Sequence, residues 1–411
     1  MKLILADQLI DGTGAKPIAK AALLFDRDRI VAVGRAADIG VPEGAEVIET
    51  APGTTLMPGL IDVHVHLAYS GAVDPNAFRA ESAFVNYPAM ALRAVRYARE
   101  SLEYGFTALR DMHAPGGTII DLRNAINAGQ IEGPRIKAPG LGLTVTGGHM
   151  DQPGFGDMVS FRDMNAACDG PVEFRRGVRR QLTRGADFIK LNPCVGNRRD
   201  ERLYRFEMTV EEITAACDEA HEQGVMVAAH TSGGPPLTAA IAAGCDTVEH
   251  AHWIDDATLE LMIERGTFLV PTLAVNEASS AYIMANPNAP SRTLNWAKAS
   301  EEAKWERLTR ARRLGVKVAA GSDAGFFLAH GKANAREIEL LVEGGYTPLE
   351  AIHCATAVGA DLMQIEAGRL AAGKFADLLL VDGDPLADIS ILRDRHKLSV
   401  YLGGKPIVRR P

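Results

Sequence analysis

From about residue 100 to residue 325, the chain repeats one pattern of polar and apolar positions. An amphipathic stretch with helical periodicity ends at a glycine, and a short apolar run follows. This happens after Gly105, Gly185, Gly224, Gly266 and Gly315, and in an Ala-Gly-Cys-Asp variant after Gly244. Glycine favours the left-handed conformation that ends a helix, and a continuous apolar run is typical of a strand buried on both faces. The pattern therefore predicts helices that alternate with buried parallel strands.

The starts of the helices and the number of repeats define the fold class. Thr209 with Glu212 and Thr347 with Glu350 both fit a capping box at a helix N-terminus. Two further apolar segments, Leu56–Val65 and Arg135–Pro139, bring the predicted strands to eight. We therefore predict an α/β protein with a (β/α)8 barrel. A doubly wound open sheet is the alternative, but no Gly-x-Gly-x-x-Gly follows the first strand.

Both ends of the chain have a different pattern from the middle. Short apolar runs broken by Asp, Gly and Pro occupy Lys2–Leu5, Ala21–Phe25, Arg29–Val33 and Glu46–Glu49. Similar runs near the C-terminus are Ala376–Val381, Leu398–Leu402 and Ile407–Val408. Short strands at this spacing indicate a small β domain, and chain termini often lie close together. We predict a composite β-sandwich domain from residues 1–56 and 365–411, and a barrel domain from residues 57–364.

Composition and charge exclude several classes of protein. The 411 residues are 47% hydrophobic and 23% charged, which suits a globular protein with a large core. The net charge of -8 and the lack of a Lys/Arg block argue against nucleic-acid binding. Asp7 comes too early for a signal peptide, and no apolar stretch approaches the ~20 residues of a membrane span. Five scattered cysteines without Cys-x-x-Cys spacing indicate reduced thiols. We expect a soluble, cytoplasmic protein with no membrane partner.

Histidines at the end of the first predicted barrel strand indicate a metal site. His64 and His66 are two residues apart, so both imidazoles lie on one face of a strand. The ends of other predicted strands carry Lys190, His230, His250 and Asp323. A barrel collects such residues at one mouth. Each of them alone could be structural, but the joint pattern favours a metal site.

Lys190 is unusual because it lies within the apolar run Phe188–Leu191. An unpaired ammonium is costly to bury, and burial lowers the pKa of a lysine. The neutral amine can react with carbon dioxide to form a carbamate, whose two oxygens can bridge two metal ions. The alternative is a buried salt bridge from Lys190 to Asp111 or Asp187.

Together these motifs resemble the amidohydrolase superfamily over nearly the whole chain. The matching segments are Pro58-Gly-Leu-Ile-Asp-Val-His-Val-His66, the Lys190 strand, Ala229-His230, Glu249-His250, Gly321-Ser-Asp323, Gly368–Asp377 and Gly383-Asp-Pro385. Within the superfamily, the chain is most similar to the branch of prolidases, basic-residue carboxypeptidases and imidazolonepropionase-like hydrolases. The Thr146-Gly-Gly-His149 segment is similar to the substrate-binding loop of that branch.

The resemblance implies a set of roles for the strand-end residues. His64, His66 and Asp323 would hold one divalent metal ion, and His230 and His250 a second. Carboxylated Lys190 and a hydroxide would bridge the two ions. Asp323 would act as the catalytic proton carrier. Zinc is the default for such nitrogen and oxygen ligands, although cobalt and manganese are not excluded. The family also implies a homo-oligomer.

The substrate-facing residues depart from the family in one place. The prolidase-like branch commonly has a tyrosine after the strand-5 histidine, whereas Thr231 and Ser232 follow His230 here. Recognition of a peptide carboxylate is therefore open. His149 is a candidate catalytic or carboxylate contact, or a residue that structures its loop. Further candidates for the substrate pocket are Tyr69, Phe155, Arg198, Arg199, Thr231, His252 and Phe326, and for supporting positions Arg110, Asp111 and Glu249.

The leading functional hypothesis is hydrolysis of a C–N amide bond by a dinuclear metal site. Its small-molecule substrate would be a dipeptide, an N-acyl amino acid or a related amide. The same site would also suit a carbamate, ester, lactone or phosphotriester. A mononuclear deaminase is less favoured because the His-x-x-Glu of that branch is replaced by His230-Thr-Ser-Gly233. A non-catalytic binding barrel would have no use for six retained ligands.

Overall fold

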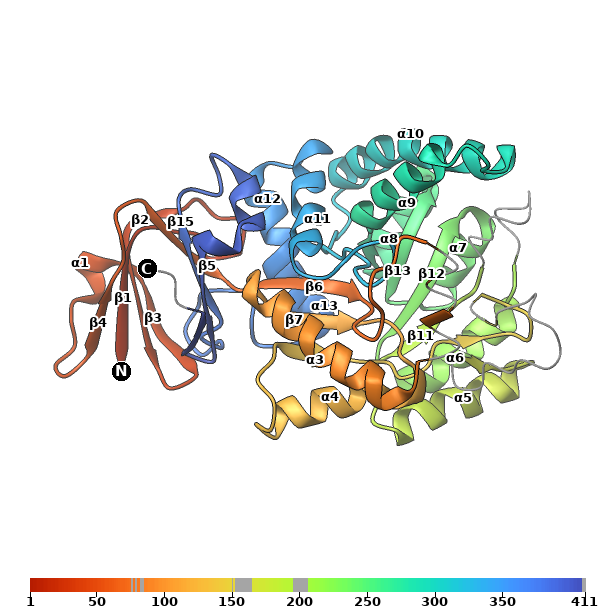
Figure 1. Cartoon of the computed structure of the whole chain (residues 1–411), viewed down its shortest axis with the longest axis horizontal. Helices are drawn as coiled ribbons and strands as arrows, with labels where there is room; N and C mark the ends of the chain where they lie inside the picture. The colour runs from red at the N-terminus through yellow and green to blue at the C-terminus, as the bar shows by residue number, and fades with distance from the viewer. Residues whose placement is uncertain are drawn as a thin grey trace.

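The computed structural model describes residues 1–74, 77, 80–81, 85–149, 151, 165–194 and 206–408, and the statements below concern these residues. The molecule has two parts, which lie side by side along its longest axis (Figure 1). A sheet at one end contains strands from both chain termini, and a barrel of strands surrounded by helices forms the other part.

The terminal sheet joins the two ends of the chain. Its eight strands run in the order β17-β16-β15-β5-β1-β2-β3, and β4 pairs with β1. Their bounds are β1 (Lys2–Leu9), β2 (Ile18–Asp26), β3 (Arg29–Arg35), β4 (Glu46–Glu49), β5 (Thr54–Pro58), β15 (Leu378–Asp382), β16 (Leu398–Leu402) and β17 (Lys405–Val408). The antiparallel pair of β5 and β15 connects the two ends, with Leu378 opposite Pro58. The sandwich arrangement and the domain boundaries stay predictions.

The predicted strand Leu56–Val65 is two strands, and this part of the prediction is wrong. β5 ends at Pro58 and belongs to the terminal sheet, whereas β6 (Leu60–Val65) begins the barrel. The break is at Gly59, where a Cβ atom would lie 2.0 Å from the Oγ1 of Thr107. The close approach of the neighbouring strand therefore requires glycine at the junction of the two parts.

Parallel strands form the wall of the barrel. Their bounds are β6 (Leu60–Val65), β7 (Phe106–Asp111), β8 (Arg135–Lys137), β11 (Ile189–Leu191), β12 (Val227–Gly233), β13 (Thr247–Trp253) and β14 (Phe268–Val270), with the short β9 (Leu143–Thr144) and β10 (Ala166–Ala167) beside β11. The amide of Asp187 donates to the carbonyl of Ala138 (2.8 Å), which links the segment after β8 to the segment before β11. The wall therefore continues across the gap between the two recorded parallel sheets.

The eighth predicted strand, from Val316 to Asp323, is less regular than expected. Val318 makes one parallel bridge to Leu269 on β14, and the amide of Val63 on β6 donates to the carbonyl of Ala320. These contacts close the ring. The ladder is incomplete because other groups take its amides: that of Ala320 donates to the carbonyl of Cys354 (3.2 Å), and that of Ser322 to the carboxylate of Asp62 (3.1 Å).

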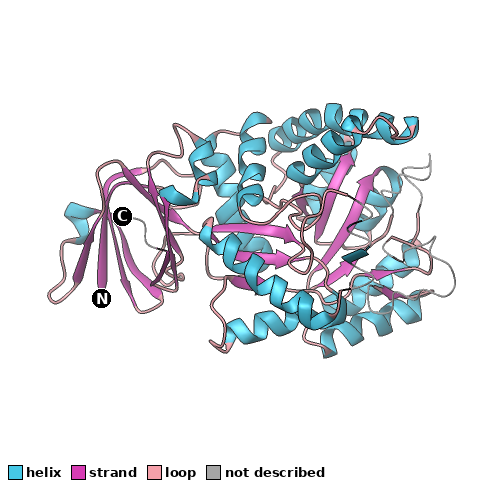
Figure 2. Ribbon diagram, in the orientation of Figure 1, coloured by secondary structure: helices cyan, strands magenta, loops and turns pink. Residues whose placement is uncertain are grey.

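Helices cover the outside of the barrel, as Figure 2 shows. Their bounds are α3 (Tyr87–Glu103), α4 (Thr118–Asn127), α5 (Pro171–Thr183), α6 (Val210–Glu222), α7 (Gly234–Ala242), α8 (Asp256–Arg265), α9 (Leu273–Ala285), α10 (Ser291–Leu314), α11 (Lys332–Glu343), α12 (Pro348–His353) and α13 (Gly359–Met363), while the short α1 (Ala36–Ile39) lies in the terminal part. Both predicted capping boxes are present. All six glycines predicted to end helices have positive φ, so the repeat in the sequence marks real helix ends.

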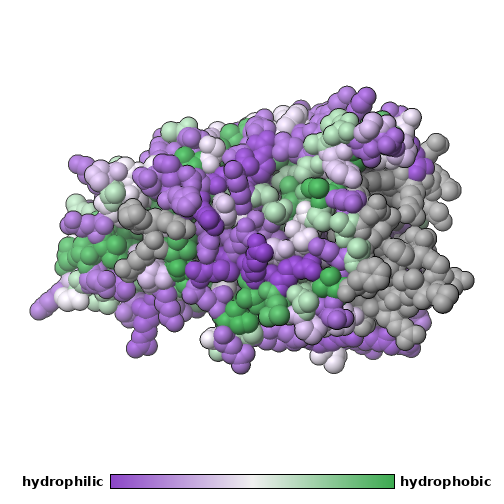
Figure 3. Space-filling view, viewed as in Figure 1, coloured by the Kyte–Doolittle hydropathy of each residue, from purple (hydrophilic) through white to green (hydrophobic). Residues whose placement is uncertain are grey.

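The surface and the cysteines add little to the functional picture. Apolar side chains gather over the strands of the terminal part on the face seen in Figure 3, whereas much of the barrel surface there is hydrophilic. All five cysteines are buried and free of disulfides, as predicted for reduced thiols. Among the described residues, no helix combines the length and the apolar character that a membrane crossing requires.

Candidate metal centre

Six predicted ligands meet at the C-terminal ends of the barrel strands. One ligand atom each from His64, His250 and Asp323 lies within 4.8 Å of the others. The Nε2 atom of His66 is 3.2 Å from the Oδ1 atom of Asp323, and the rings of His230 and His250 are 4.5 Å apart between centroids. Lys190, from β11, is close enough to Asp323 and Glu249 for their charges to affect its pKa. His64 lies near the end of β6 and His66 directly follows the strand, and both reach this side, as the sequence predicts.

The backbone is strained where two of these side chains leave the wall. His250 and Asp323 have φ values of 68° and 62°, and Ala251 has a φ of 44°. Left-handed backbone costs a non-glycine residue about 1–3 kcal/mol and persists only where the surroundings hold it. At Asp323 the backbone amide donates to the carbonyl of His64 at 2.7 Å, which fixes the turn against β6.

The chemistry of these side chains fits a divalent metal ion. The Nε2 atom of His230 is buried and has no hydrogen-bond partner among the described residues. Burial, and then the neighbouring His149 and Lys190, hold the pKa of His230 well below its usual value. Burial and the nearby His230 do the same for His250. Neutral imidazoles are the form that binds metals, and a buried nitrogen without a partner is costly unless an ion takes its lone pair.

A buried ion pair holds His64 in place. Its Nδ1 atom is 2.8 Å from a carboxylate oxygen of Glu249, and the other oxygen accepts a 2.8 Å hydrogen bond from Arg110. Burial alone would raise the pKa of Glu249, but the Arg110 guanidinium and His64 hold it well below its usual value. A carboxylate behind the Nδ1 atom directs the Nε2 atom of the ring toward the centre. Arg110 and Glu249 are therefore supporting residues in this geometry.

A second set of contacts holds His250. The Nδ1 atom of His250 is 2.7 Å from the hydroxyl of Thr272, which follows β14. The guanidinium of Arg307, from α10, donates to the backbone carbonyl of His250. Sequence reasoning missed both contacts. The Pro-Thr pair after the β14 run was a usable signal for Thr272, whereas nothing in the polar pattern of α10 marks Arg307.

Lys190 is buried without the counter-charge that the alternative hypothesis requires. Its exposed fraction is 5%, and burial lowers its pKa to about 8. Asp187 pairs with Arg123 and Lys137 instead, and Asp111 accepts the amides of Leu67 and His113. Among the described residues, none forms an ion pair with Lys190. The salt-bridge alternative is therefore not what this fold contains, and the neutral amine is accessible near neutral pH.

Two of the predicted substrate contacts, His149 and His252, have imidazole rings close to those of candidate ligands. The His149 ring stacks on that of His230 with centroids 4.1 Å apart, and its backbone amide donates to Glu207 at 2.9 Å. The His252 ring is 6.1 Å from that of His250. Both imidazoles therefore border the centre without belonging to the six-residue set.

The remaining predicted contacts are less directly placed. Tyr69 is 1% exposed, and its ring is 6.2 Å from that of His66. Phe326 packs edge-on against Phe327 at 5.0 Å. Thr231 is fully buried and follows His230 on β12, so strand alternation favours the opposite face for its side chain. The predictions for Phe155, Arg198 and Arg199 fall outside the described residues, and the roles of all these residues stay predictions.

Comparison with known proteins agrees with this arrangement. A profile of the amidohydrolase family matches residues 55–407. The ochratoxinase of Aspergillus niger is 33% identical over 426 aligned positions, which cover 98% of this chain and 86% of that protein. The crystal structure of a Xaa-Pro dipeptidase with bound methionine superposes with a TM-score of 0.88 at 31% identity, over 99% of this chain and 100% of that one.

A more distant similarity is to an imidazolonepropionase, one of the kinds of enzyme in the branch that the sequence resembles. The imidazolonepropionase of Cupriavidus taiwanensis is 26% identical, over 96% of this chain and 92% of that protein. The family match spans most of the chain, and the two closer likenesses cover nearly all of it. The chain therefore belongs to the amidohydrolase family and is a hydrolase that acts on carbon–nitrogen bonds.

Proposed function

We propose that this chain hydrolyses an amide bond of a small molecule with the help of two divalent metal ions. The observation that supports the proposal most is the convergence of the six candidate ligands at one barrel mouth, with a buried His230 nitrogen that has no partner among the described residues. In the proposal, His64, His66 and Asp323 hold one ion, and His230 and His250 hold the other. Zinc is the default for these ligands.

Lys190 supplies the negative charge that the second position lacks. The two imidazoles proposed to hold the second ion, those of His230 and His250, carry no negative charge. A neutral amine, made accessible by burial, reacts with carbon dioxide to give an anionic carbamate and a released proton. Carboxylated Lys190 would offer one oxygen to each ion. The absence of an ion pair to Lys190 among the described residues supports this role, because a salt bridge would keep the amine protonated.

Asp323 carries the proton in the proposed reaction. Divalent ions held by these residues would polarise the amide carbonyl and lower the pKa of a water molecule, which would supply a nucleophile at neutral pH. The Asp323 carboxylate takes a proton from the attacking water and gives it to the nitrogen as the C–N bond breaks. Its Oδ1 atom lies 3.2 Å from the Nε2 atom of His66 and 3.5 Å from that of His64, and it has no hydrogen-bond partner among the described residues, which leaves it free to accept a proton.

The substrate class is proposed from the loops and from the relatives. The His149 ring, stacked on His230, can donate to the carbonyl oxygen as negative charge develops there. Ochratoxinase and a Xaa-Pro dipeptidase are among the similar proteins. Their names support an N-acyl amino acid or a dipeptide as substrate. Thr231 in place of the tyrosine of the prolidase-like branch favours an amide recognised differently from Xaa-Pro.

Metal analysis and a substrate panel test the proposal together. Metal-replete protein is expected to hold about two ions per chain, and a value below about one and a half contradicts the dinuclear site. The panel contains N-acyl amino acids, dipeptides, carbamates and aryl esters. Hydrolysis of N-acyl amino acids or dipeptides with the highest kcat/KM supports the proposal. A clear preference for carbamates or esters would replace the amide with the alternative substrate class.

Lys190→Ala tests the carbamate. The variant is expected to lose most of its metal and activity, and short carboxylates such as formate should restore part of both because they supply the missing oxygens. Lys137→Ala is the matched control. Lys137 lies on β8 and forms an ion pair with Asp187 at 3.5 Å, so this variant removes a lysine of the barrel wall that has a partner. Full metal content and activity in Lys190→Ala would exclude the bridging role.

A further inference from the structure

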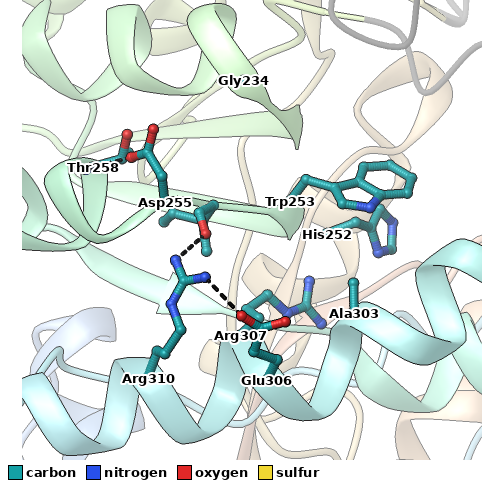
Figure 4. Close-up of a pocket in the computed structure, with 10 residues that line it drawn as sticks. Gly234, His252, Trp253, Asp255, Thr258, Ala303, Glu306, Arg307 and Arg310 are labelled. Atoms are coloured by element: carbon teal, nitrogen blue, oxygen red, sulfur yellow. Dashed lines mark hydrogen bonds and ion pairs between the residues drawn. The ribbon is translucent and has the colours of Figure 1, made fainter.

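A cavity lies near the candidate metal centre, at the end of β13. Its volume is about 320 Å³, and its walls come from β13, from the start of α7 and α8, and from α10 (Figure 4). We call it the Arg307 pocket. It is lined by Gly234, His252, Trp253, Ile254, Asp255, Thr258, Ala303, Glu306, Arg307 and Arg310. Gly234 directly follows β12, and Ile254 and Asp255 directly follow β13. The C-terminal ends of the strands form the catalytic face of a barrel.

Arg307 is a buried cation whose charge is not neutralised locally. Its exposed fraction is 2%, and its guanidinium donates hydrogen bonds to the carbonyls of His250 and Pro271. Its Nε–H is buried without a partner among the described residues. Glu337 and Glu301 lie near enough to raise its pKa, but burial has the larger effect and lowers it to about 10. Neither carboxylate forms an ion pair with it, so the group is a charged donor with unused capacity at neutral pH.

The other charges around the Arg307 pocket are already engaged. Arg310 pairs with Asp256 at 2.7 Å and with Glu306 at 3.3 Å, as the dashed line to Glu306 in Figure 4 shows. The carboxylate of Asp255 caps α8 by accepting the amide of Thr258 at 2.8 Å. Asp255 and Glu306 are both exposed, so their charges are screened by water. Among the described residues that line the pocket, Arg307 is the buried one whose charge has no ion-pair partner.

Two further features favour an anion with an organic body. α7 begins beside the pocket at Gly234 without a side-chain cap, and the next two residues, Pro235 and Pro236, have no amide N–H, so this end of α7 can favour an anion through its helix dipole but offers few amide donors. Trp253 and Ile254 give the pocket an apolar side. A carboxylate attached to a small apolar or aromatic group matches both walls, whereas a bare inorganic anion would use only one.

The Arg307 pocket shares a wall with the metal centre. The His252 ring lines the pocket and is 6.1 Å from the ring of His250, a candidate ligand. Arg307 itself donates to the backbone carbonyl of His250. A ligand that spans from the centre past His252 would therefore place its far end against Arg307.

We propose that the Arg307 pocket binds the carboxylate group of the amide substrate and of the amino acid released from it. The inference rests on the proposed function and supplies what that proposal left open. The chain lacks the tyrosine that precedes Gly-Gly in the prolidase-like branch. In this proposal Arg307, which contacts the backbone carbonyl of His250, binds the substrate carboxylate in place of that tyrosine.

A binding experiment separates this inference from the hydrolytic function. Metal-replete full-length protein is titrated with L-phenylalanine and with L-phenylalaninamide, which lacks the negative charge, and tryptophan fluorescence is recorded. The acid should bind more tightly than the amide. Arg307→Met should weaken the acid by about 10- to 100-fold and leave the amide unchanged, because a charged hydrogen-bond donor is removed. Metal content is measured in each variant, since Arg307 also contacts His250.

Arg310→Gln is the matched control, because this arginine lines the same pocket but is already paired. It should change the affinity for the acid by less than about threefold. If Arg307→Met does not fold, Trp253→Phe is the deciding variant. Because Trp253 lines the pocket, its replacement should remove the fluorescence change that binding of the acid causes. Equal binding of acid and amide, or a full fluorescence change in Trp253→Phe, would overturn the inference. Acid binding that depends on Arg307 in a protein without amidase activity would instead refute the proposed function alone.

Discussion

The two halves of the candidate metal centre differ in how their charge is balanced. In the half at β6, His64 and His66 face the carboxylate of Asp323, and a Glu249–Arg110 ion pair stands behind His64. In the half at β12 and β13, His230 and His250 are accompanied by Lys190, and burial together with neighbouring positive groups keeps the pKa of both imidazoles well below the usual value. The first half is complete in charge, and the second lacks an anion.

This difference indicates which half is built by the fold and which is completed by chemistry. Protein groups already orient and neutralise the β6 half. The β12–β13 half has neutral donors held by Thr272 and by the backbone contact from Arg307. An anion added at Lys190 would balance it. Variants in the first half should therefore destroy a finished site, while variants in the supports of the second half should loosen a site that metal and carbamate help to complete.

The largest effect is expected from Asp323→Asn. The amide keeps the shape of the side chain but cannot carry a proton, and general acid–base catalysis contributes about 10²- to 10⁴-fold. We therefore expect kcat to fall by at least about 10³-fold, since a metal ligand weakens at the same time. Initial rates and metal content of the same preparation measure the two effects. Asp382→Asn, at an exposed position on β15, is the control. Activity within tenfold of the wild type would remove Asp323 from the reaction.

The next effect is expected from Glu249→Gln, which breaks the support behind His64. Loss of such a supporting carboxylate typically lowers metal affinity by about 10- to 100-fold. Stability should fall by about 3–5 kcal/mol because Arg110 is left buried without its partner. Competition with a chelator measures the affinity, and urea unfolding measures the stability.

Glu339→Gln is the matched control for Glu249→Gln. Glu339 is also a buried carboxylate paired with arginines, Arg336 and Arg393, but it lies on α11 away from the candidate ligands. This variant should lose stability and keep its metal affinity. An equal loss of affinity in both variants would mean that the effect of Glu249 is general destabilisation and not orientation of His64.

Sequence reasoning reached the first half of the centre more fully than the second. Strand alternation and the barrel rule place His64, His66 and Asp323 together from the sequence, and Glu249 and Arg110 were marked as supports. The contacts of Thr272 and Arg307 depend on how α9 and α10 pack over the barrel mouth, which no local pattern specifies. The same limit applies to the fold. The helix-ending glycines were predictable, whereas the break at Gly59 depends on the approach of Thr107 from another strand.

Thr272→Val tests the support of the second half. Valine keeps the shape of threonine but removes the hydroxyl that lies 2.7 Å from the Nδ1 atom of His250. We expect about a tenfold loss of metal affinity, at the low end for a supporting residue, because the backbone contact from Arg307 remains. The chelator competition that serves for Glu249→Gln measures it.

Thr267→Val provides the comparison for Thr272→Val. The hydroxyl of Thr267 is also buried, but it donates to the carbonyl of Cys245 at 3.3 Å and touches no candidate ligand. It should cost stability without a change in metal affinity. Should Thr272→Val bind metal as tightly as the wild type, the hydroxyl does not orient His250, and the two halves would not differ in this respect.

The smallest effect on metal affinity is expected from Glu337→Gln, which acts on stability and tests how the segment behind the second half is held. Glu337 accepts the amides of Leu273 and Ala274, the first residues of α9 after Thr272, at 3.0 and 2.7 Å. Burial raises the pKa of Glu337 from 4.5 to about 8. Its folded pKa is above its unfolded value, so the folded state binds an extra proton between these pH values. Stability should therefore fall as the pH rises from about 4.5 to 8, by up to about 1.4 kcal/mol per pH unit, and change no further above 8. Glutamine cannot lose a proton, so the variant should lack this component. Urea unfolding of both proteins at pH 5, 6.5 and 8 measures it as a difference in slope. Parallel slopes would show that Glu337 is ionised throughout, and the α9 segment would then carry an anion of its own close to Arg307.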